Sequence, residues 1–111
     1  MIITLISGLL LGVVIGTFLE EIIDWAKKFV ENDLPIIIKK AFVYLKRLPG
    51  AIIRFIRYIK DGKMMEKEGG EHEVSLEELE RMYREGHITR EEFEQLSAGK
   101  KTHYADIERA A

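Results

Sequence analysis

Residues 1–19, MIITLISGLLLGVVIGTFL, contain no charged side chain. A helix rises about 1.5 Å per residue, so this stretch would span about 28 Å, close to the thickness of the hydrocarbon core of a bilayer. Acidic residues begin at Glu20, but no helix breaker occurs before Asn32. The stretch therefore predicts a transmembrane helix with an extension, covering residues 1–31.

Small residues recur every fourth position along this predicted helix. Residues four apart lie on one helix face, and glycines on such a face let two backbones approach closely in a membrane. This glycine zipper predicts self-association, with the same chain or another membrane protein as partner. Its ridge consists of Thr4, Gly8, Gly12, Gly16 and Glu20. Beyond the ridge, Trp25 and Phe29 are expected near the membrane interface, where aromatic rings prefer to lie.

Two other interpretations of the apolar stretch are weaker. A cleaved signal peptide begins with basic residues, and residues 1–19 contain none. A buried helix of a soluble domain would need more apolar chain around it than the remaining residues supply, unless a large assembly surrounds it.

The net charge of −2 conceals a segregation of charge along the 111 residues. Residues 34–63 contain one acid, Asp61, against eight bases: Lys39, Lys40, Lys46, Arg47, Arg54, Arg57, Lys60 and Lys63. Basic residues beside a membrane segment stay on the cytoplasmic side, which predicts the N-terminus outside and the C-terminus in the cytoplasm. The chain has no cysteine, which excludes disulfides, thiolate metal sites and cysteine nucleophiles.

The basic middle, residues 34–61, is interpreted as two amphipathic helices separated by Leu48-Pro49-Gly50. We expect them to lie in the headgroup plane, where their eight bases, with Lys63 included, meet anionic lipid. Three alternatives stay open: packing of the apolar faces against each other or neighbouring subunits, a re-entrant segment, and nucleic-acid binding. The last is disfavoured because the aromatic residues are expected on the apolar face, away from the bases.

The acidic C-terminal part contains the clearest local signals. Residues 62–74 are charged and lack apolar periodicity, so we predict a linker. Ser75 with Glu78, and Thr89 with Glu92, form two capping boxes, which predict a helical hairpin over residues 75–98 followed by a polar tail, residues 99–111. The hairpin's apolar contact residues are Leu76, Leu79, Met82, Tyr83, Ile88, Phe93 and Leu96.

Residues 75–97 resemble a known module. The run LEEL at 76–79 and the run REGHITREEFE at 84–94 are similar to the SHOCT family, the "short C-terminal domain". That family has a leucine-rich turn followed by a Gly-x-Ile-Thr-x-Glu-Glu-Phe step into a second helix. The resemblance implies oligomerisation or an interaction appendage rather than catalysis, and it supplies no active-site residues.

Together these patterns predict an all-α, single-span membrane protein that is not an enzyme. We find no catalytic constellation, no cofactor motif and no metal-ligand spacing among the histidines. The leading hypothesis is a homo-oligomer that scaffolds or anchors an assembly at an anionic lipid bilayer, with a protein partner for the hairpin and no nucleic acid. The alternatives are a pore-forming, holin-like or toxin-like protein, and a membrane-associated structural component of a virus particle.

Overall fold

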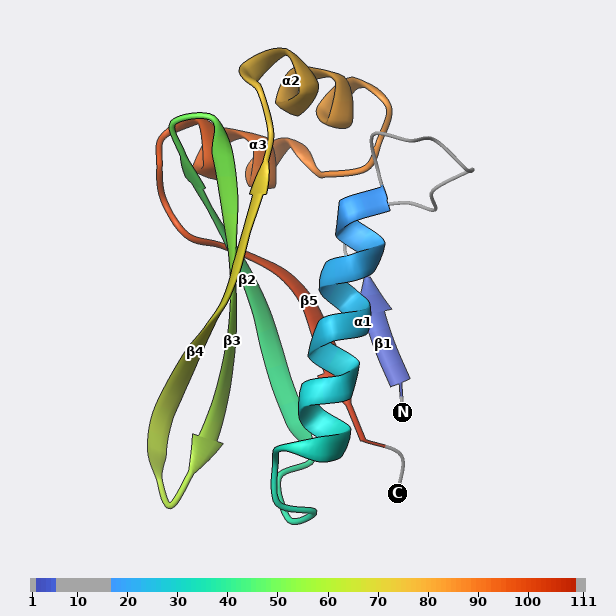
Figure 1. Cartoon of the computed structure of the whole chain (residues 1–111), viewed down its shortest axis with the longest axis vertical. Helices are drawn as coiled ribbons and strands as arrows, with labels where there is room; N and C mark the ends of the chain where they lie inside the picture. The colour runs from blue at the N-terminus through green and yellow to red at the C-terminus, as the bar shows by residue number, and fades with distance from the viewer. Residues whose placement is uncertain (1, 6–16, 110–111) are drawn as a thin grey trace.

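The computed structural model describes residues 2–5 and 17–109 of the chain. Within them, five strands form one antiparallel sheet and three helices pack around it (Figure 1). The elements are β1 (Ile2–Leu5), α1 (Thr17–Asn32), β2 (Lys40–Leu48), β3 (Ala51–Lys60), β4 (Lys63–Glu73), α2 (Leu76–Arg84), α3 (Arg90–Ser97) and β5 (Thr102–Glu108). The predicted all-α fold is therefore wrong.

The sheet has the strand order β1-β5-β2-β3-β4, and each neighbouring pair is antiparallel. β2, β3 and β4 follow one another through two-residue turns, Pro49-Gly50 and Asp61-Gly62. Asp61 and Gly62 both have positive φ, at 53° and 74°, as the tight turn of a β-hairpin requires. β5 lies between β1 and β2, so the predicted polar tail is an inner strand of the sheet.

Residues 34–61 form a connection followed by the strands β2 and β3, rather than the two predicted amphipathic helices. Ala41, Val43 and Leu45 are buried in alternation with less buried neighbours, which is the period of a strand. The segment is rich in β-branched and aromatic residues, which favour strands. Its apolar residues are so closely spaced that they also fit one face of a helix. The two pairs interpreted as helix ends are hairpin turns, namely Pro49-Gly50 and Asp61-Gly62.

The N-terminal prediction also fails. β1 is a strand that pairs with β5, and α1 begins only at Thr17, so no continuous helix covers residues 1–31. Within the described part of the chain, no helix combines the length and the apolar character needed to cross a membrane. The predicted single-pass placement, with the N-terminus outside and the C-terminus in the cytoplasm, is therefore wrong.

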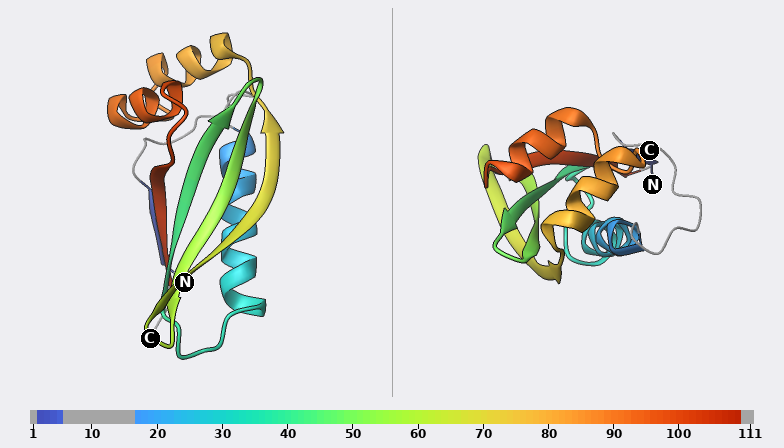
Figure 2. Two further views of the ribbon diagram at one scale, coloured as in Figure 1. Left: turned by 90° about the vertical axis from the view of Figure 1, so that its left-hand side faces the viewer. Right: turned by 90° about the horizontal axis from the view of Figure 1, so that it is seen from above.

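α1 packs along one face of the sheet (Figure 2). Its buried positions recur at helical spacing, and its charged residues face outward. The buried positions are Leu19, Ile22, Ile23, Ala26, Phe29 and Val30. With Val43, Leu45, Ile52, Ile56 and Ile107 of the sheet they form the core of the protein. The helix is thus amphipathic because it covers a sheet.

The predicted linker, residues 62–74, is the edge strand β4. It lacks apolar periodicity because nearly all of its side chains are exposed. The register shifts where Gly69 and Gly70 lie opposite the Ile53–Phe55 region of β3. Gly69 lies against the ring of Trp25, and a Cβ atom there would come within 2.3 Å of it. This glycine is therefore required by close packing of β4 on α1.

Both capping boxes are present in the structure. Ser75 and Thr89 each accept a hydrogen bond from the backbone amide of the residue three positions on, at 3.1 Å, and Glu78 and Glu92 bond back to them. α2 and α3 lie over one end of the sheet (Figure 1). Arg47 at the end of β2 donates a hydrogen bond to the Leu96 carbonyl at 3.2 Å, which ties α3 to the sheet.

Candidate functional site

The face of the sheet turned away from α1 combines aromatic rings with charges. Alternate residues of a strand point to opposite faces of the sheet. Phe42 and Tyr44 therefore lie on the face opposite to that of the buried Val43 and Leu45. We call this surface the outer face and define it by Lys40, Phe42, Tyr44, Phe55, Arg57, Glu66, Lys101, His103 and Asp106. β2, β3, β4 and β5 all contribute to it.

Glu66 is the centre of one ion-pair network on the outer face. Its two carboxylate oxygens accept hydrogen bonds from Lys101 Nζ and Arg57 Nε, both at 2.7 Å. The hydrogen bond from Lys101, reinforced by Arg57, lowers the pKa of Glu66. The bond to Glu66 in turn raises the pKa of Arg57. One carboxylate thus pairs with two cations, and the network links β3, β4 and the residue that precedes β5.

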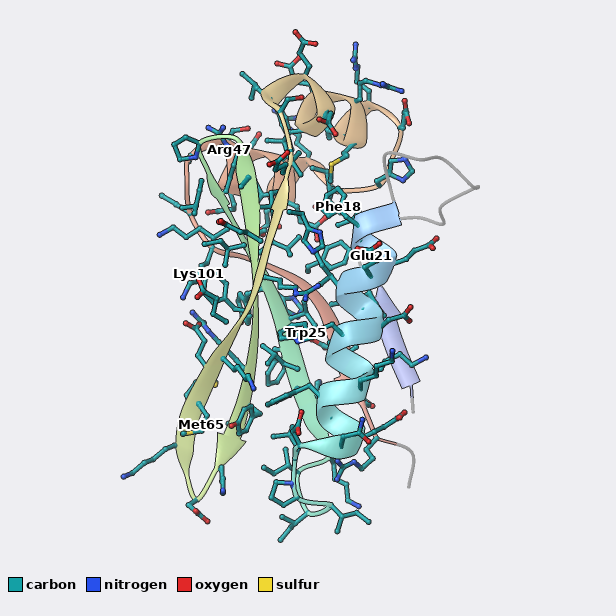
Figure 3. The ribbon with its side chains drawn as sticks, viewed as in Figure 1. Phe18, Glu21, Trp25, Arg47, Met65 and Lys101 are labelled. Atoms are coloured by element: carbon teal, nitrogen blue, oxygen red, sulfur yellow. The ribbon has the colours of Figure 1, made fainter. Side chains whose placement is uncertain are left out.

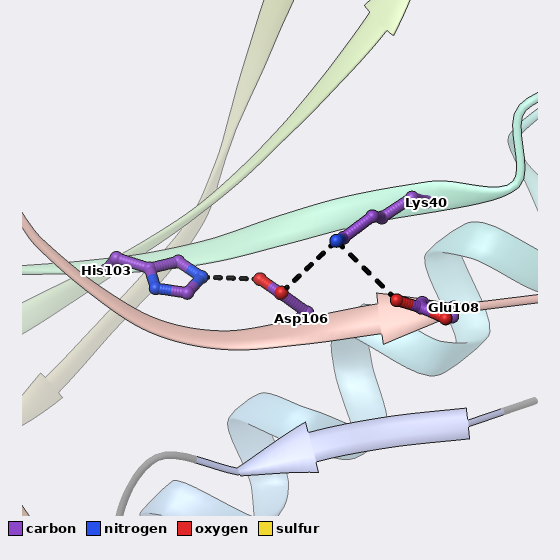
Figure 4. A network of polar contacts seen from close by, with 4 residues as sticks. All are labelled: Lys40, His103, Asp106 and Glu108. Atoms are coloured by element: carbon purple, nitrogen blue, oxygen red, sulfur yellow. Dashed lines mark hydrogen bonds and ion pairs between the residues drawn. The ribbon is translucent and has the colours of Figure 1, made fainter.

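A second network lies on β2 and β5 (Figure 4). Lys40 Nζ is 3.5 Å from a carboxylate oxygen of both Asp106 and Glu108. Asp106 also contacts His103, with 2.5 Å between Nε2 and Oδ1. Lys40, the lysine of this network, is therefore paired with two carboxylates.

The cations of both networks also cover the aromatic rings. Arg57 lies 4.2 Å from the centroid of the Tyr44 ring, and Lys101 lies 4.1 Å from that of Phe55. The aromatic residues therefore do lie among the bases, contrary to the sequence-based expectation. A platform for nucleic acid needs free ring faces and unpaired cations, and these contacts occupy both.

The interface between α1 and β4 contains a further polar cluster, around the Trp25 side chain labelled in Figure 3. Arg54 lies 4.8 Å from the centroid of Trp25, donates to the Gly69 carbonyl at 2.5 Å and lies 3.2 Å from Nε2 of His72. Burial lowers the pKa of Arg54, and burial together with the Arg54 charge lowers that of His72. Every polar contact of this cluster joins β3, β4 and α1, so its role is structural.

One end of the molecule exposes apolar side chains. Seven large hydrophobic residues of the described chain are exposed, and five of them lie in the α1–β2 connection or beside the β3–β4 turn. These five are Ile36, Ile37, Ile59, Met64 and Met65. Ile36 and Ile37 are 77% and 80% exposed, which is unusual because isoleucine is among the most frequently buried residue types.

The two segments at this end flank a shared groove. The groove has a volume of about 510 Å³, and its apolar lining consists of Pro35, Ile37, Ile38, Phe42 and Ile59. The apolar side chains are interspersed with Lys39, Lys60 and Lys63, and Arg109 donates hydrogen bonds to the carbonyls of the neighbouring loop. We call this surface the basic end. The groove itself is lined by Lys39, Lys40 and Lys60 against one acid, Asp61, so positive charge predominates.

The two remaining exposed hydrophobic residues lie on α2. Leu76 is 53% exposed and Tyr83 is 37% exposed. They are seven positions apart and share a stripe with Glu80, and we call this stripe the α2 surface. Six glutamates lie in and beside α2, against Arg81 and Arg84: Glu71, Glu73, Glu77, Glu78, Glu80 and Glu85. Arg81 is paired with Glu85, so negative charge predominates.

The structure places the sequence-predicted site residues in several different settings. Of the glycine-zipper set, Thr4 lies in β1 and Glu20 in the first turn of α1, whereas Gly8, Gly12 and Gly16 lie outside the described residues. Trp25 and Phe29 pack on the sheet through Arg54 and Tyr58 rather than at a membrane interface.

The predicted membrane-surface bases do not form one surface. Lys40 and Arg57 belong to the outer face, Arg54 lies under α1, and Arg47 binds α3. Lys46 lies on β2 and is half-buried. Lys39, Lys60 and Lys63 belong to the basic end, and Lys40 lines its groove as well. The spread follows from the strand period, which sends neighbouring bases to opposite faces.

The predicted hairpin contacts divide into buried and exposed residues. Leu79, Met82, Ile88 and Leu96 are buried in the core. Tyr83 stacks on Phe93, with ring centroids 4.8 Å apart, while Leu76 faces outward. The exposed apolar residues of the basic end were missed as a site, because the helical interpretation assigned Ile37 and Ile59 to lipid-facing surfaces.

Over residues 2–5 and 17–109, no three histidine, aspartate or glutamate side chains converge on a position that could hold a metal ion. His87 and Glu92 are each 2% exposed and leave ring or carboxylate atoms without a hydrogen bond. They lie within the packed α2–α3 end rather than in a groove.

Comparisons with protein-family models, curated proteins and solved structures give no match to this chain. The resemblance of residues 75–97 to the SHOCT family therefore stays a prediction.

Proposed function

We propose that this chain is a non-enzymatic assembly protein that binds further copies of itself through the basic end. The observation that supports this most strongly is the exposure of five apolar side chains in two segments at one end of the chain, of which Ile37 and Ile59 line a shared groove. Contiguous exposed apolar residues with a polar rim are typical of protein-binding surfaces. The outer face and the Arg54 cluster are weaker candidates, because their charges and rings are already paired within the chain.

A second copy is the favoured partner because the chain carries a complementary surface. The basic end needs an occupant that is apolar and acidic, and α2 exposes Leu76 and Tyr83 among glutamates. Opposite charge on matching apolar surfaces raises the association rate and selects the correct partner. The resemblance to the SHOCT family, which implies oligomerisation, points the same way.

The test is the molecular mass of the full chain as a function of concentration, by sedimentation velocity and light scattering. We expect the mass to rise with concentration, and the variant Ile36→Ser/Ile37→Ser to shift that rise to at least tenfold higher concentration. The reason is that burying one isoleucine side chain stabilises by about 1.5–3 kcal/mol, and 1.4 kcal/mol is about tenfold in affinity.

The matched control is Glu68→Gln, an exposed change on β4 away from both surfaces. It should leave the concentration dependence unchanged. Circular dichroism should be the same for all three proteins, because none of the substituted side chains is buried. A wild-type chain that stays monomeric up to millimolar concentration would contradict the proposal.

A further inference from the structure

The two exposed apolar surfaces lie at opposite ends of the molecule. Figure 1 shows α2 at one end, and the α1–β2 connection and the β3–β4 turn at the other. The longest dimension of the chain is 41 Å. Because of this separation, the basic end of one copy cannot reach the α2 surface of the same copy.

Like-with-like pairing of these surfaces is unfavourable. Two basic ends placed face to face would bring Lys39, Lys60 and Lys63 against the same three lysines. Two α2 surfaces would bring Glu77 and Glu80 against their own equivalents. Like charges brought together without partners cost free energy and act against a pairing even when the apolar shapes agree.

We infer that the copies associate head to tail, with the basic end of one copy seated on the α2 surface of the next. Ile36, Ile37 and Ile59 then cover Leu76 and Tyr83, while the lysines of the basic end face Glu77 and Glu80. This inference rests on the proposed self-association and specifies the surface that each copy contributes.

A head-to-tail contact uses two different surfaces of each subunit. After one contact forms, the outer copies still present one free basic end and one free α2 surface. Such heterologous contacts produce an open chain, or a ring if the rotation between copies closes. A symmetric dimer would instead use up its contact surface and stop at two copies.

The test uses two variants that each disable one surface. The basic-end variant is Ile36→Ser/Ile37→Ser, and the α2 variant is Leu76→Ser/Glu80→Gln; all four positions are exposed. Each variant alone should remain monomeric at a concentration where the wild type assembles. An equimolar mixture should form a complex of one copy of each and grow no further, because only one intact pair of surfaces is available.

The possible outcomes separate this inference from the proposal beneath it. If each variant alone still forms dimers, or the α2 variant assembles like the wild type, the head-to-tail arrangement is wrong although self-association stands. If the wild type itself never assembles, both the proposed self-association and the head-to-tail arrangement are wrong. The Glu68→Gln variant, mixed with either single-surface variant, should behave as the wild type does in that mixture.

Discussion

At Gly69 the backbone of β4 lies directly against the Trp25 ring of α1. A Cβ atom there would lie 2.3 Å from the Trp25 ring, which is shorter than van der Waals contact allows. We expect Gly69→Ala to lower the free energy of unfolding by about 1–3 kcal/mol, the usual cost of overpacking. Urea denaturation followed by circular dichroism measures the change.

The control for this prediction is a double-mutant cycle with Trp25→Leu. If the clash is the cause, Gly69→Ala should lower the free energy of unfolding much less in the Trp25→Leu background. The interaction energy between the two substitutions should then exceed about 0.3–0.5 kcal/mol, the range within which independent substitutions add. Equal costs in both backgrounds would mean that the backbone of β4, rather than the ring, determines the effect.

At the scale of elements, α3 depends on a buried carboxyl group. Glu92 bonds back to its N-cap Thr89 but is 2% exposed, and its Oε2 atom has no partner. Burial raises the pKa of Glu92 above its ordinary value. A raised pKa in the folded state means that folding favours the protonated form, so this contribution to stability is present at low pH and lost as pH rises through the raised pKa.

We therefore predict that Glu92→Gln becomes more favourable, relative to the wild type, as pH increases from 4 to 7. Glutamine keeps an oxygen for the Thr89 amide and carries no charge that burial could penalise. Each unit of pKa elevation corresponds to about 1.4 kcal/mol at high pH. Glu77→Gln, an exposed change in the first turn of α2, is the matched control, and its effect should vary less with pH.

The α2–α3 region was predictable in detail, whereas the sheet was not, and the reason is the range of the determining interactions. A capping box depends only on two residues three positions apart. The local sequence therefore predicts the starts of α2 and α3, through Ser75 with Glu78 and Thr89 with Glu92. The spacing of Ala41, Phe42, Tyr44 and Leu45 fits two periods equally well. Only pairing with β3 and β5 decides that these residues form a strand.

The strand β5 gave no sequence signal because it is short and polar residues interrupt it. Thr102, Tyr104, Ala105 and Ile107 are nevertheless buried, since the strand lies inside the sheet and α1 and α3 pack against it. The candidate site was missed because of the same error. With residues 34–61 interpreted as helices, the exposure of Ile37 and Ile59 at one end of the molecule could not be recognised.

At the scale of the whole molecule, the opposite charges of the two ends predict a dependence on salt. Attraction between exposed charges is screened beyond about 10 Å at 0.1 M ionic strength and beyond about 3 Å at 1 M. We expect the dissociation constant for self-association to rise several-fold between 0.05 and 0.5 M NaCl, measured by sedimentation equilibrium.

The variant Lys60→Gln/Lys63→Gln provides the comparison for this prediction. Its assembly should be weaker than that of the wild type at low salt and should change less when salt is added. An association that strengthens with added NaCl would indicate that apolar contact alone holds the copies together.

The placement of β5 between β1 and β2 determines the order in which the fold can be completed. Ile2 pairs with Glu108, so the first strand has to wait for a hydrogen-bonding partner that is synthesised about a hundred residues later. The meander of β2, β3 and β4 contains only local contacts and can form as it leaves the ribosome. Until β5 is made, β1 and one edge of β2 stay open, and this interval is when a nascent chain would most need a chaperone.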